Sequence, residues 1–231
     1  MNHLPIQLLN RPDTNDDHEF YRQNFIFTIW QMPALVLNIS LSMEPFVNYI
    51  LQFGHLNPEQ IDFILGKAKI LKLRKDEYFS EAGKIPKHVG FNLKGVLRFC
   101  YYNHHGNEIT HSFVEEHSFV SDQQRFESQI ASSEYIQAES DCELLVFSKK
   151  DWDEIGSSVV GWKDIENLIV KNCLLKTIER RSPLVSEDAT TRYLTFNKYY
   201  PGLITRVPLS HIASYLGITQ QSLSRIRRNV R

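Results

Sequence analysis

Gln, Arg, Ser and Thr side chains dominate the C-terminal end of the chain, with no acidic residue between Thr219 and Arg231. Gln and Arg can hydrogen-bond the edges of DNA bases, whereas Ser, Thr and Arg suit phosphate oxygens. These residue types therefore predict a DNA contact. We expect base contacts from Gln220, Gln221 and Arg225, and phosphate contacts from Thr219, Ser222, Ser224, Arg227 and Arg228.

Two short helices would have to position these side chains. Gly217 lies where a tight turn between helices needs a positive φ, Ala213 is small where crossing helices approach, and Thr219 is a good N-cap. Apolar residues fall at helical spacings on both sides of the turn: Ile212, Leu216, Leu223 and Ile226. The pattern predicts a helix-turn-helix. The alternative is an ordinary helical hairpin packed into a core.

The distribution of charge supports a nucleic-acid contact. Residues 180–231 contain nine Lys or Arg and two acidic residues, although the whole chain has a formal net charge of −1. This stretch therefore carries +7 and the rest of the chain −8, a separation typical of phosphate contact. A solvated surface would show the same charge bias. Here, however, the basic stretch coincides with the predicted helix pair, and this coincidence favours a nucleic-acid contact.

Length and composition limit the other possibilities. At 231 residues and 42% hydrophobic content, the chain has room for one moderate domain and a small one. Cys100, Cys142 and Cys173 are widely spaced without a C-x-x-C pattern, which predicts neither a disulfide framework nor an iron–sulfur or zinc site. We expect buried free thiols in a reducing cytoplasm, and neither a metal nor a cofactor.

The first 42 residues differ from the rest. They are polar over 10–19 and uncharged over 24–43, and an amphipathic helical pattern begins at Met43. We expect residues 1–42 to be a poorly ordered extension, with Met43 as the functional start. A membrane anchor is the alternative, although Gln31 and Pro33 interrupt the apolar run.

Short alternating runs between residues 68 and 147 predict β-strands. Turn residues separate the runs, which cover 70–74, 89–93, 96–102, 109–114, 135–138 and 143–147. Such a series predicts a β-barrel or a sandwich, which we assign to residues 43–150 together with flanking helices.

A long helix is predicted from Trp162 to about Arg181, ending at Pro183. Its wide apolar face needs a partner, which could be the barrel wall, a second copy of the chain, or both. We therefore assign residues 151–185 to a connecting and dimerisation segment and residues 186–231 to the helix-turn-helix domain. Dimer contacts are expected from Ile165, Leu168, Ile169 and Leu175.

This order of elements resembles the Crp/Fnr family of bacterial transcription regulators. The resemblance covers about 43–228 and rests on KGVLRFCY (Lys94–Tyr101), FVSD (Phe119–Asp122), the helix from Trp162 and, most specifically, Ser210–Arg227. It implies an α+β chain with an N-terminal β-barrel, a double-stranded β-helix of the cyclic-nucleotide-binding type. It also implies a cytoplasmic homodimer that binds double-stranded DNA and RNA polymerase and has no enzymatic activity.

The expected effector site departs from that family. Its cyclic-nucleotide binders carry a Gly-Glu pair for the ribose and an Arg-Ser/Thr pair for the phosphate, whereas this chain has Ser121-Asp122 and Ser132-Ser133-Glu134. Because an arginine fork holds a cyclic phosphate, we expect no binding of cyclic AMP in the usual mode. An unknown small-molecule effector would contact Phe119, Ser121, Asp122, Arg125, Ser132 and Ser133.

Two further departures concern the ends of the chain. The N-terminal cysteine cluster of the family's iron–sulfur oxygen sensors is missing. The family commonly adds a β-hairpin wing after the recognition helix, but this sequence ends at Arg231. We expect the backbone contacts of a wing to be absent or supplied by upstream residues such as Arg206.

Two other functions are alternatives. A ligand-binding sensor could act through a protein partner without binding DNA. A metal-dependent barrel enzyme could use the histidine-rich group His104, His105, Glu108, His111 and His117. Adjacent residues of a strand point in opposite directions, and Gly106-Asn107 follows, so an exposed hairpin turn is the preferred interpretation of His104 and His105.

Overall fold

The computed structural model describes residues 43–230. The two expectations for residues 1–42, a poorly ordered extension or a membrane anchor, lie outside the described residues. Within 43–230 no helix combines the length and the apolar character that crossing a membrane requires.

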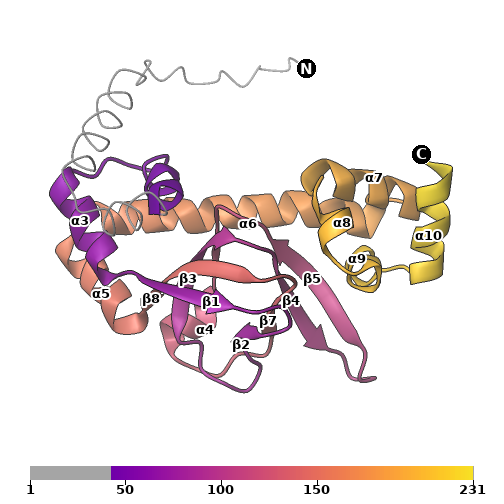
Figure 1. The fold of residues 1–231 in the computed structure, drawn as a ribbon, viewed down its shortest axis with the longest axis horizontal. Coiled ribbons are helices and arrows are strands. Elements are labelled where there is room, and N and C mark those ends of the chain that lie inside the picture. The colour runs from indigo at the N-terminus through magenta and orange to yellow at the C-terminus, as the bar shows by residue number, and fades with distance from the viewer. Residues whose placement is uncertain (1–42, 231) are drawn as a thin grey trace, which may run out of the picture. The chain divides into compact units, whose positions relative to one another are not determined.

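Two four-stranded antiparallel sheets form the β-domain (Figure 1), one with the strand order β1-β8-β3-β6 and the other with the order β2-β7-β4-β5. The predicted barrel is therefore an open jelly-roll sandwich, because no ladder joins the two sheets within the described residues. Six strands match the predicted runs, and β2 and β6, of three residues each, were missed. The strands are β1 (Lys69–Leu73), β2 (Tyr78–Ser80), β3 (His88–Lys94), β4 (Leu97–Tyr102), β5 (Glu108–Val114), β6 (Ser118–Val120), β7 (Tyr135–Ala138) and β8 (Cys142–Ser148).

Successive residues of β8 serve two different cores. Leu144 and Val146 pack between the sheets, whereas Leu145 and Phe147 pack against helices on the outer face. All four are at most 4% exposed. The strand is apolar without interruption because both of its faces are covered.

Helices cover the outer face of the β1-β8-β3-β6 sheet. Residues 43–50 are helical, as the amphipathic pattern from Met43 predicts. Phe46, Ile50, Ile61 and Ile64 are buried in this layer. A capping box between Asn57 and Gln60 starts α3. The other helices of the β-domain are α3 (Pro58–Lys67), α4 (Gln123–Ser128) and α5 (Lys149–Ser158).

The long helix α6 (Trp162–Ser186) runs from α5 to the C-terminal helices (Figure 1). The prediction that it ends at Pro183 is wrong, because Pro183 lies inside the helix. A proline removes one helical hydrogen bond. Leu184 packs on the C-terminal apolar cluster, and the amide of Glu187 donates to the carbonyl of Pro183 at 3.0 Å in the last turn.

Four helices complete the chain, and their last two form the predicted helix-turn-helix. Gly217 has φ +65° at the turn, and the hydroxyl of Thr219 accepts a hydrogen bond from the amide of Ser222. Both features match the sequence prediction. The helices are α7 (Ala189–Tyr199), α8 (Leu203–Arg206), α9 (Leu209–Leu216) and α10 (Gln220–Asn229).

The core of these helices extends into the β-domain. Val96 and Phe113 of the sandwich belong to the same buried cluster as Ile212, Leu216 and Leu223. Met43–Arg231 accordingly forms one compact unit. The domain boundaries that we placed at 150 and 185 stay predictions.

Replacing Gly217 by Ala is expected to lower the free energy of unfolding by about 1 kcal/mol, because a side chain is strained at a positive φ. The new Cβ would meet only Arg192 Nη1 at 3.4 Å, so crowding adds little. Urea unfolding measures the change. In the matched control, Gly66→Ala within α3, the new Cβ meets nothing within 4 Å, and helix propensity favours Ala. A similar loss at both positions would contradict this account of the turn.

Candidate DNA-binding surface and ligand cavity

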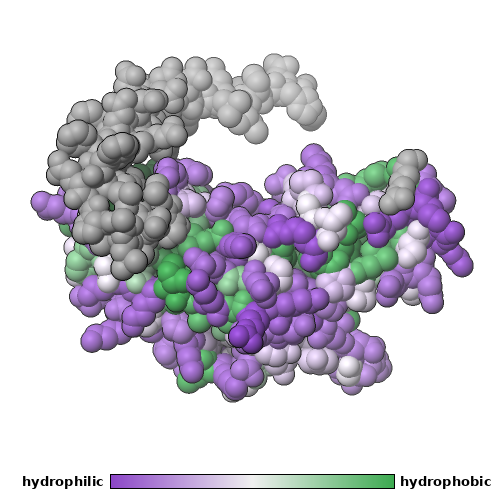
Figure 2. All heavy atoms as spheres, viewed as in Figure 1, coloured by the Kyte–Doolittle hydropathy of each residue, from purple (hydrophilic) through white to green (hydrophobic). Residues whose placement is uncertain are grey.

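The helix α10 presents a polar outer face and is anchored by one buried residue. Leu223 is fully buried among α7 and α9 residues, and Ile226 is partly buried beside it. The predicted base-contacting residues Gln220, Gln221 and Arg225 are all exposed. Figure 2 shows that the edge of the molecule formed by α10 is hydrophilic. The side chains expected to read DNA therefore share an accessible helix face.

The predicted phosphate-contacting residues divide into two groups. The hydroxyl of Thr219 accepts from the amide of Ser222 at 3.1 Å and lies 2.9 Å from the hydroxyl of Ser222, so both hydroxyls already serve the helix cap. Arg228 is exposed, and Ser224 and Arg227 are half-buried. The guanidinium groups are thus better placed than the cap hydroxyls to meet a phosphate.

The side chain of Arg206, which we expected as a possible substitute for a wing, is paired within the chain. Its guanidinium forms a bidentate ion pair with Glu116 of the loop after β5, with Nη1 3.0 Å from Oε2 and Nη2 on Oε1. Its donors are thus used within the chain. The expectation that the contacts of a wing are absent or supplied by residues such as Arg206 stays a prediction.

The residues predicted for the dimer face of α6 point in two directions. Ile165 and Ile169 pack into the helical layer over the sandwich and are 2% and 5% exposed. Because their own chain covers them, Ile165 and Ile169 do not lie on a face that a second copy could contact. Leu168 and Leu175 are exposed on the other side of the helix.

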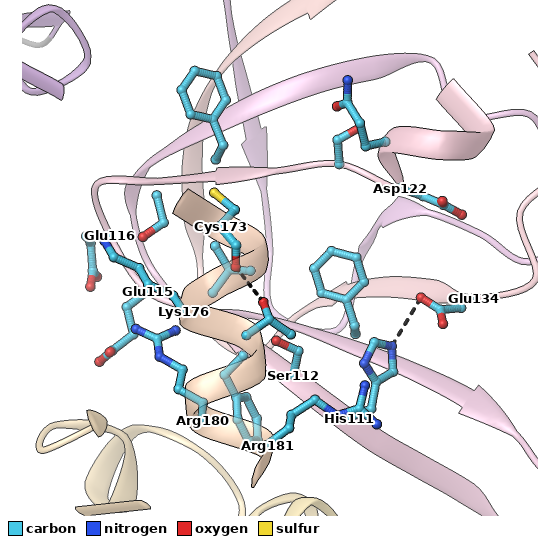
Figure 3. A pocket seen from close by; sticks show the side chains of 18 of the residues that line it. His111, Ser112, Glu115, Glu116, Asp122, Glu134, Cys173, Lys176, Arg180 and Arg181 are labelled. Carbon is cyan, nitrogen blue, oxygen red and sulfur yellow. Dashed lines mark hydrogen bonds and ion pairs between the residues drawn. The ribbon is translucent and has the colours of Figure 1, made fainter. Parts of the chain in front are cut away.

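A cavity of about 500 Å³ lies between α6 and the β5–β6 part of the sandwich (Figure 3). Of the predicted effector residues, Phe119, Ser121 and Asp122 line it. The hydroxyl of Ser121 is buried without a hydrogen-bond partner, which leaves it available to a ligand. A smaller apolar cavity of about 120 Å³ shares Phe119 and Ser121 and extends toward Trp152.

The other predicted effector residues lie outside this cavity. The buried hydroxyl of Ser132 donates to Oδ2 of Asp122 at 2.6 Å and accepts from the amide of Glu134 at 3.1 Å. Ser133 is exposed, and neither it nor Arg125 lines the cavity. This segment serves the hydrogen bonding of its own loop. The assignment of Arg125, Ser132 and Ser133 to an effector site stays a prediction.

The basic residues of the cavity come from α6. Figure 3 shows Lys176 and Arg180 on the side of Glu115 and Glu116, whereas Arg181 reaches toward His111. In the sequence, Arg180 and Arg181 stand out only through their contribution to the positive charge of residues 180–231, and their place in the cavity was not predicted. Their spacing on a long helix gave no sign of which side they would occupy.

The side chains of His111 and Glu134 lie in contact within the cavity (Figure 3). Nε2 of His111 lies 3.1 Å from Oε2 of Glu134. The hydrogen bond from His111 lowers the pKa of the Glu134 carboxyl, burial opposes this shift, and the charges of His111 and Arg181 add to the lowering.

The remaining histidines of the predicted metal group lie apart. His104 and His105 stand in the exposed turn between β4 and β5, as expected, and His117 is exposed before β6. Glu108 is engaged by Arg98 at 2.6 Å. Among the described residues, no group of three or more His, Cys, Asp or Glu side chains could hold a metal ion.

The cysteines are free thiols in the described structure. Cys100 and Cys142 are buried, as expected, and burial raises the pKa of each thiol to about 11. Cys173 differs from the expectation in being half-buried, since it lines both cavities.

The sandwich is similar to a known protein domain. A model of the cyclic nucleotide-binding domain matches residues 70–158, from β1 through α5. No curated protein sequence matches the chain.

Three solved structures are similar to the chain. FixK2 from Bradyrhizobium japonicum has a TM-score of 0.60 at 17% identity, covering 71% of this chain and 84% of that chain. CLP, a c-di-GMP-responsive global regulator from Xanthomonas campestris, has a TM-score of 0.58 at 14% identity, covering 75% and 91%. A protein from Eubacterium rectale assigned to the Crp/Fnr family has a TM-score of 0.62 at 16% identity, covering 79% and 87%. At these identities the likeness concerns the fold.

Residues 70–158 are similar to the cyclic nucleotide-binding domain. The described chain as a whole has the fold of the Crp/Fnr transcription regulators, with the jelly-roll sandwich followed by a long helix and a helix-turn-helix. The resemblance noted in the sequence is thus confirmed for the fold.

Replacing His111 by Gln is expected to raise the pKa of the Glu134 carboxyl toward its ordinary value, because the His111 hydrogen bond is the largest lowering influence. A carboxyl with a lowered pKa stabilises the fold above its ordinary pKa, and this contribution is lost as the pH falls through the lowered value. Carbon-13 NMR titration of the Glu side chains measures the shift. Arg125→Gln is the control and should raise the pKa less, since Arg125 acts only through a smaller charge effect. An unchanged titration in His111→Gln would refute the pairing.

Proposed function

We propose that this protein is a homodimeric, sequence-specific DNA-binding regulator of transcription. The observation that carries the proposal is the exposed face of α10, where Gln220, Gln221 and Arg225 stand clear of the chain's own core while Leu223 holds the helix in place. A helix with exposed Gln and Arg and no acidic residue suits the major groove.

The exposed side of α6 supports dimerisation. Leu168 and Leu175 are seven residues apart, as are Ile178 and Val185, and these side chains are 45%, 56%, 53% and 91% exposed respectively. A seven-residue apolar repeat is the seam of a two-stranded coiled coil. Leaving so much apolar surface in water is costly, so a second copy of α6 is the partner that fits the pattern.

In the proposed complex, two α10 helices enter successive major grooves about 34 Å apart. Arg225 contacts a guanine edge, and Gln220 and Gln221 favour adenine or tune the flanking sequence. Arg227 and Arg228 contact phosphates, with Ser224 nearby and the capped hydroxyls of Thr219 and Ser222 at the helix start. Such a regulator would act in the cytoplasm on RNA polymerase and would carry out no catalysis.

The cavity beside α6 is the proposed effector site, for a small molecule of unknown identity. Binding of cyclic AMP in the usual mode is not expected, because the arginines that line the cavity come from α6 and the sandwich contributes none. Ser132, in the segment that corresponds to the family's phosphate site, is already bonded to Asp122. The unpartnered hydroxyl of Ser121 is the sandwich-side group that a ligand could bond.

Selection of bound sequences from a random DNA pool tests the proposed function. The expected result is a palindromic site. On that site Arg225→Ala should cost about 1–3 kcal/mol and relax the base preference at one position of each half-site. Arg228→Ala is the matched variant and should weaken specific and random duplexes alike, with a flatter salt dependence. Binding titrations at several salt concentrations measure both.

Three outcomes would contradict these roles. Equal losses of Arg225→Ala on specific and random duplexes would remove Arg225 from base recognition. An unchanged salt slope would remove Arg228 from the phosphate contacts. A wild-type protein that shifts no genomic fragment in a mobility assay would instead favour a sensor that acts through a protein partner.

Replacing Leu175 by Asp is expected to convert the dimer into a monomer, because the charge would lie in the apolar seam between two α6 helices. Sedimentation velocity measures the mass. Val160→Asp is the control, since Val160 is 85% exposed in the turn before α6 and lies outside the repeat. A dimer that survives Leu175→Asp would show that α6 is not its interface.

A further inference from the structure

The helix α9 covers an open edge of the sandwich. β5 is the last strand in the order β2-β7-β4-β5, so no strand within residues 43–230 pairs with its outer edge. Such an edge leaves backbone groups without partners. The hydroxyl of Ser214 accepts from the amide of Thr110 at 3.0 Å and donates to the carbonyl of Glu108 at 3.4 Å. A side chain of α9 thus takes the place of a neighbouring strand.

An aromatic contact continues the same interface. The ring of Phe113 on β5 lies 5.6 Å from that of Tyr215 and 6.2 Å from those of Phe196 and Tyr200. Phe113 is 1% exposed. The helix-turn-helix therefore shares an apolar core with the sheet, in addition to its connection through the chain.

A buried ion pair reaches from the sheet to α9. The side chains of Arg98 and Glu139 are 3% and 2% exposed, with Nε 2.8 Å from Oε1. The same Oε1 lies 2.7 Å from Nδ1 of His211. A carboxylate paired with arginine can only accept hydrogen bonds, so Nδ1 of His211 carries the proton. Removing one member of such a network leaves a buried charge without its partner.

A second acid–base contact lies nearer the surface. Glu116 forms the bidentate pair with Arg206 at the end of α8, and Oε1 of Glu116 also accepts from the amide of Gly95 at 2.8 Å. The side chains of Arg206 and Glu116 are 35% and 29% exposed. An exposed ion pair alone contributes little, but the fork geometry fixes direction as well as distance.

These contacts leave the DNA-reading face free. They use the end of α8 and the sheet-facing side of α9, whereas Gln220, Gln221 and Arg225 stay exposed on α10. The docking thus does not hide α10. It sets the direction of α10 relative to the sandwich and, through the sandwich, to α6.

We propose that Glu139 and Glu116 are positioning residues for DNA binding, which hold the helix-turn-helix on the sheet through His211 and Arg206 and so fix the spacing of the two α10 helices in a dimer. The inference rests on the proposed function. When both helices are fixed, the second half-site binds without a further ordering cost, but only at one spacing. A released helix-turn-helix loses affinity and tolerates other spacings.

The test uses the full chain with Arg206→Gln and His211→Gln combined, which leaves both sheet carboxylates in place. Lys198→Gln on the exposed part of α7 is the control for the lost charge. Each single variant is measured as well, in case the double variant does not fold. Hydrogen exchange of the Thr110 amide reports docking without DNA. We expect exchange about tenfold faster in the double variant and unchanged in the control. Unchanged protection would overturn the inference.

The second arm uses three duplexes: the selected palindrome, one half-site, and the palindrome with two base pairs inserted between the half-sites. The double variant should bind the half-site as tightly as the wild type and the palindrome about tenfold more weakly. The loss of affinity caused by the two inserted base pairs should be about tenfold smaller for the double variant than for the wild type. An equal insertion penalty, or a loss on the half-site alone, would overturn the positioning role, since the latter would assign Arg206 or His211 to DNA itself. A wild type without any preferred sequence would refute the proposed function, and the exchange result would still decide the docking.

Discussion

The packing of Trp162, Ile165 and Ile169 onto the helical face of the sandwich holds α6 in place, and the other functional features depend on where this helix lies. The ring of Trp162 is fully buried and stands edge-on to that of Trp152 at 5.3 Å. The indole N–H of Trp152 donates to Oε1 of Glu166 at 2.7 Å, which ties α5 to the same turn of α6. Because the start of α6 is held on several sides, the rest of the helix has a defined direction.

That direction gives the three sides of α6 different surroundings. One side lines the cavity with Lys176 and Arg181, and another exposes the apolar repeat. Arg180 links the cavity to the C-terminal helices, with its guanidinium 4.7 Å from the ring centroid of Tyr200 and Nη1 3.2 Å from the Tyr200 hydroxyl. A ligand, a partner subunit and the DNA-binding helices would thus all act on one rigid element, which is the arrangement that coupling between sites requires.

The sandwich contributes shape to the cavity but little positive charge. Asp122 caps α4 and is bonded to Ser132, so this acidic side chain is occupied within its own loop. The hydroxyl of Ser121 and the ring of Phe119 are among the groups that this part of the sandwich presents to the cavity. A few loop residues thus set the chemistry that a common scaffold presents to a ligand.

The sequence by itself determined the features that depend on neighbouring residues. The turn at Gly217, the cap at Thr219 and six of the strands are set by local φ preferences, capping and alternation, which act within a few positions. It also indicated the order of the domains and the polar face of α10. Two short strands were missed, since strands of three residues carry almost no periodic signal. The alternation of the runs left a barrel and a sandwich both open, and the tertiary structure decided for the open sandwich.

Only the tertiary structure decided what distant residues do together. It brought Arg98, Glu139 and His211 into one network, although Arg98 and His211 lie more than a hundred positions apart. It buried Ile165 while exposing Leu168, and it carried α6 past Pro183 because Leu184 gained an apolar partner. Such outcomes depend on which surfaces the chain topology places opposite each other, and local preferences contain no information about that.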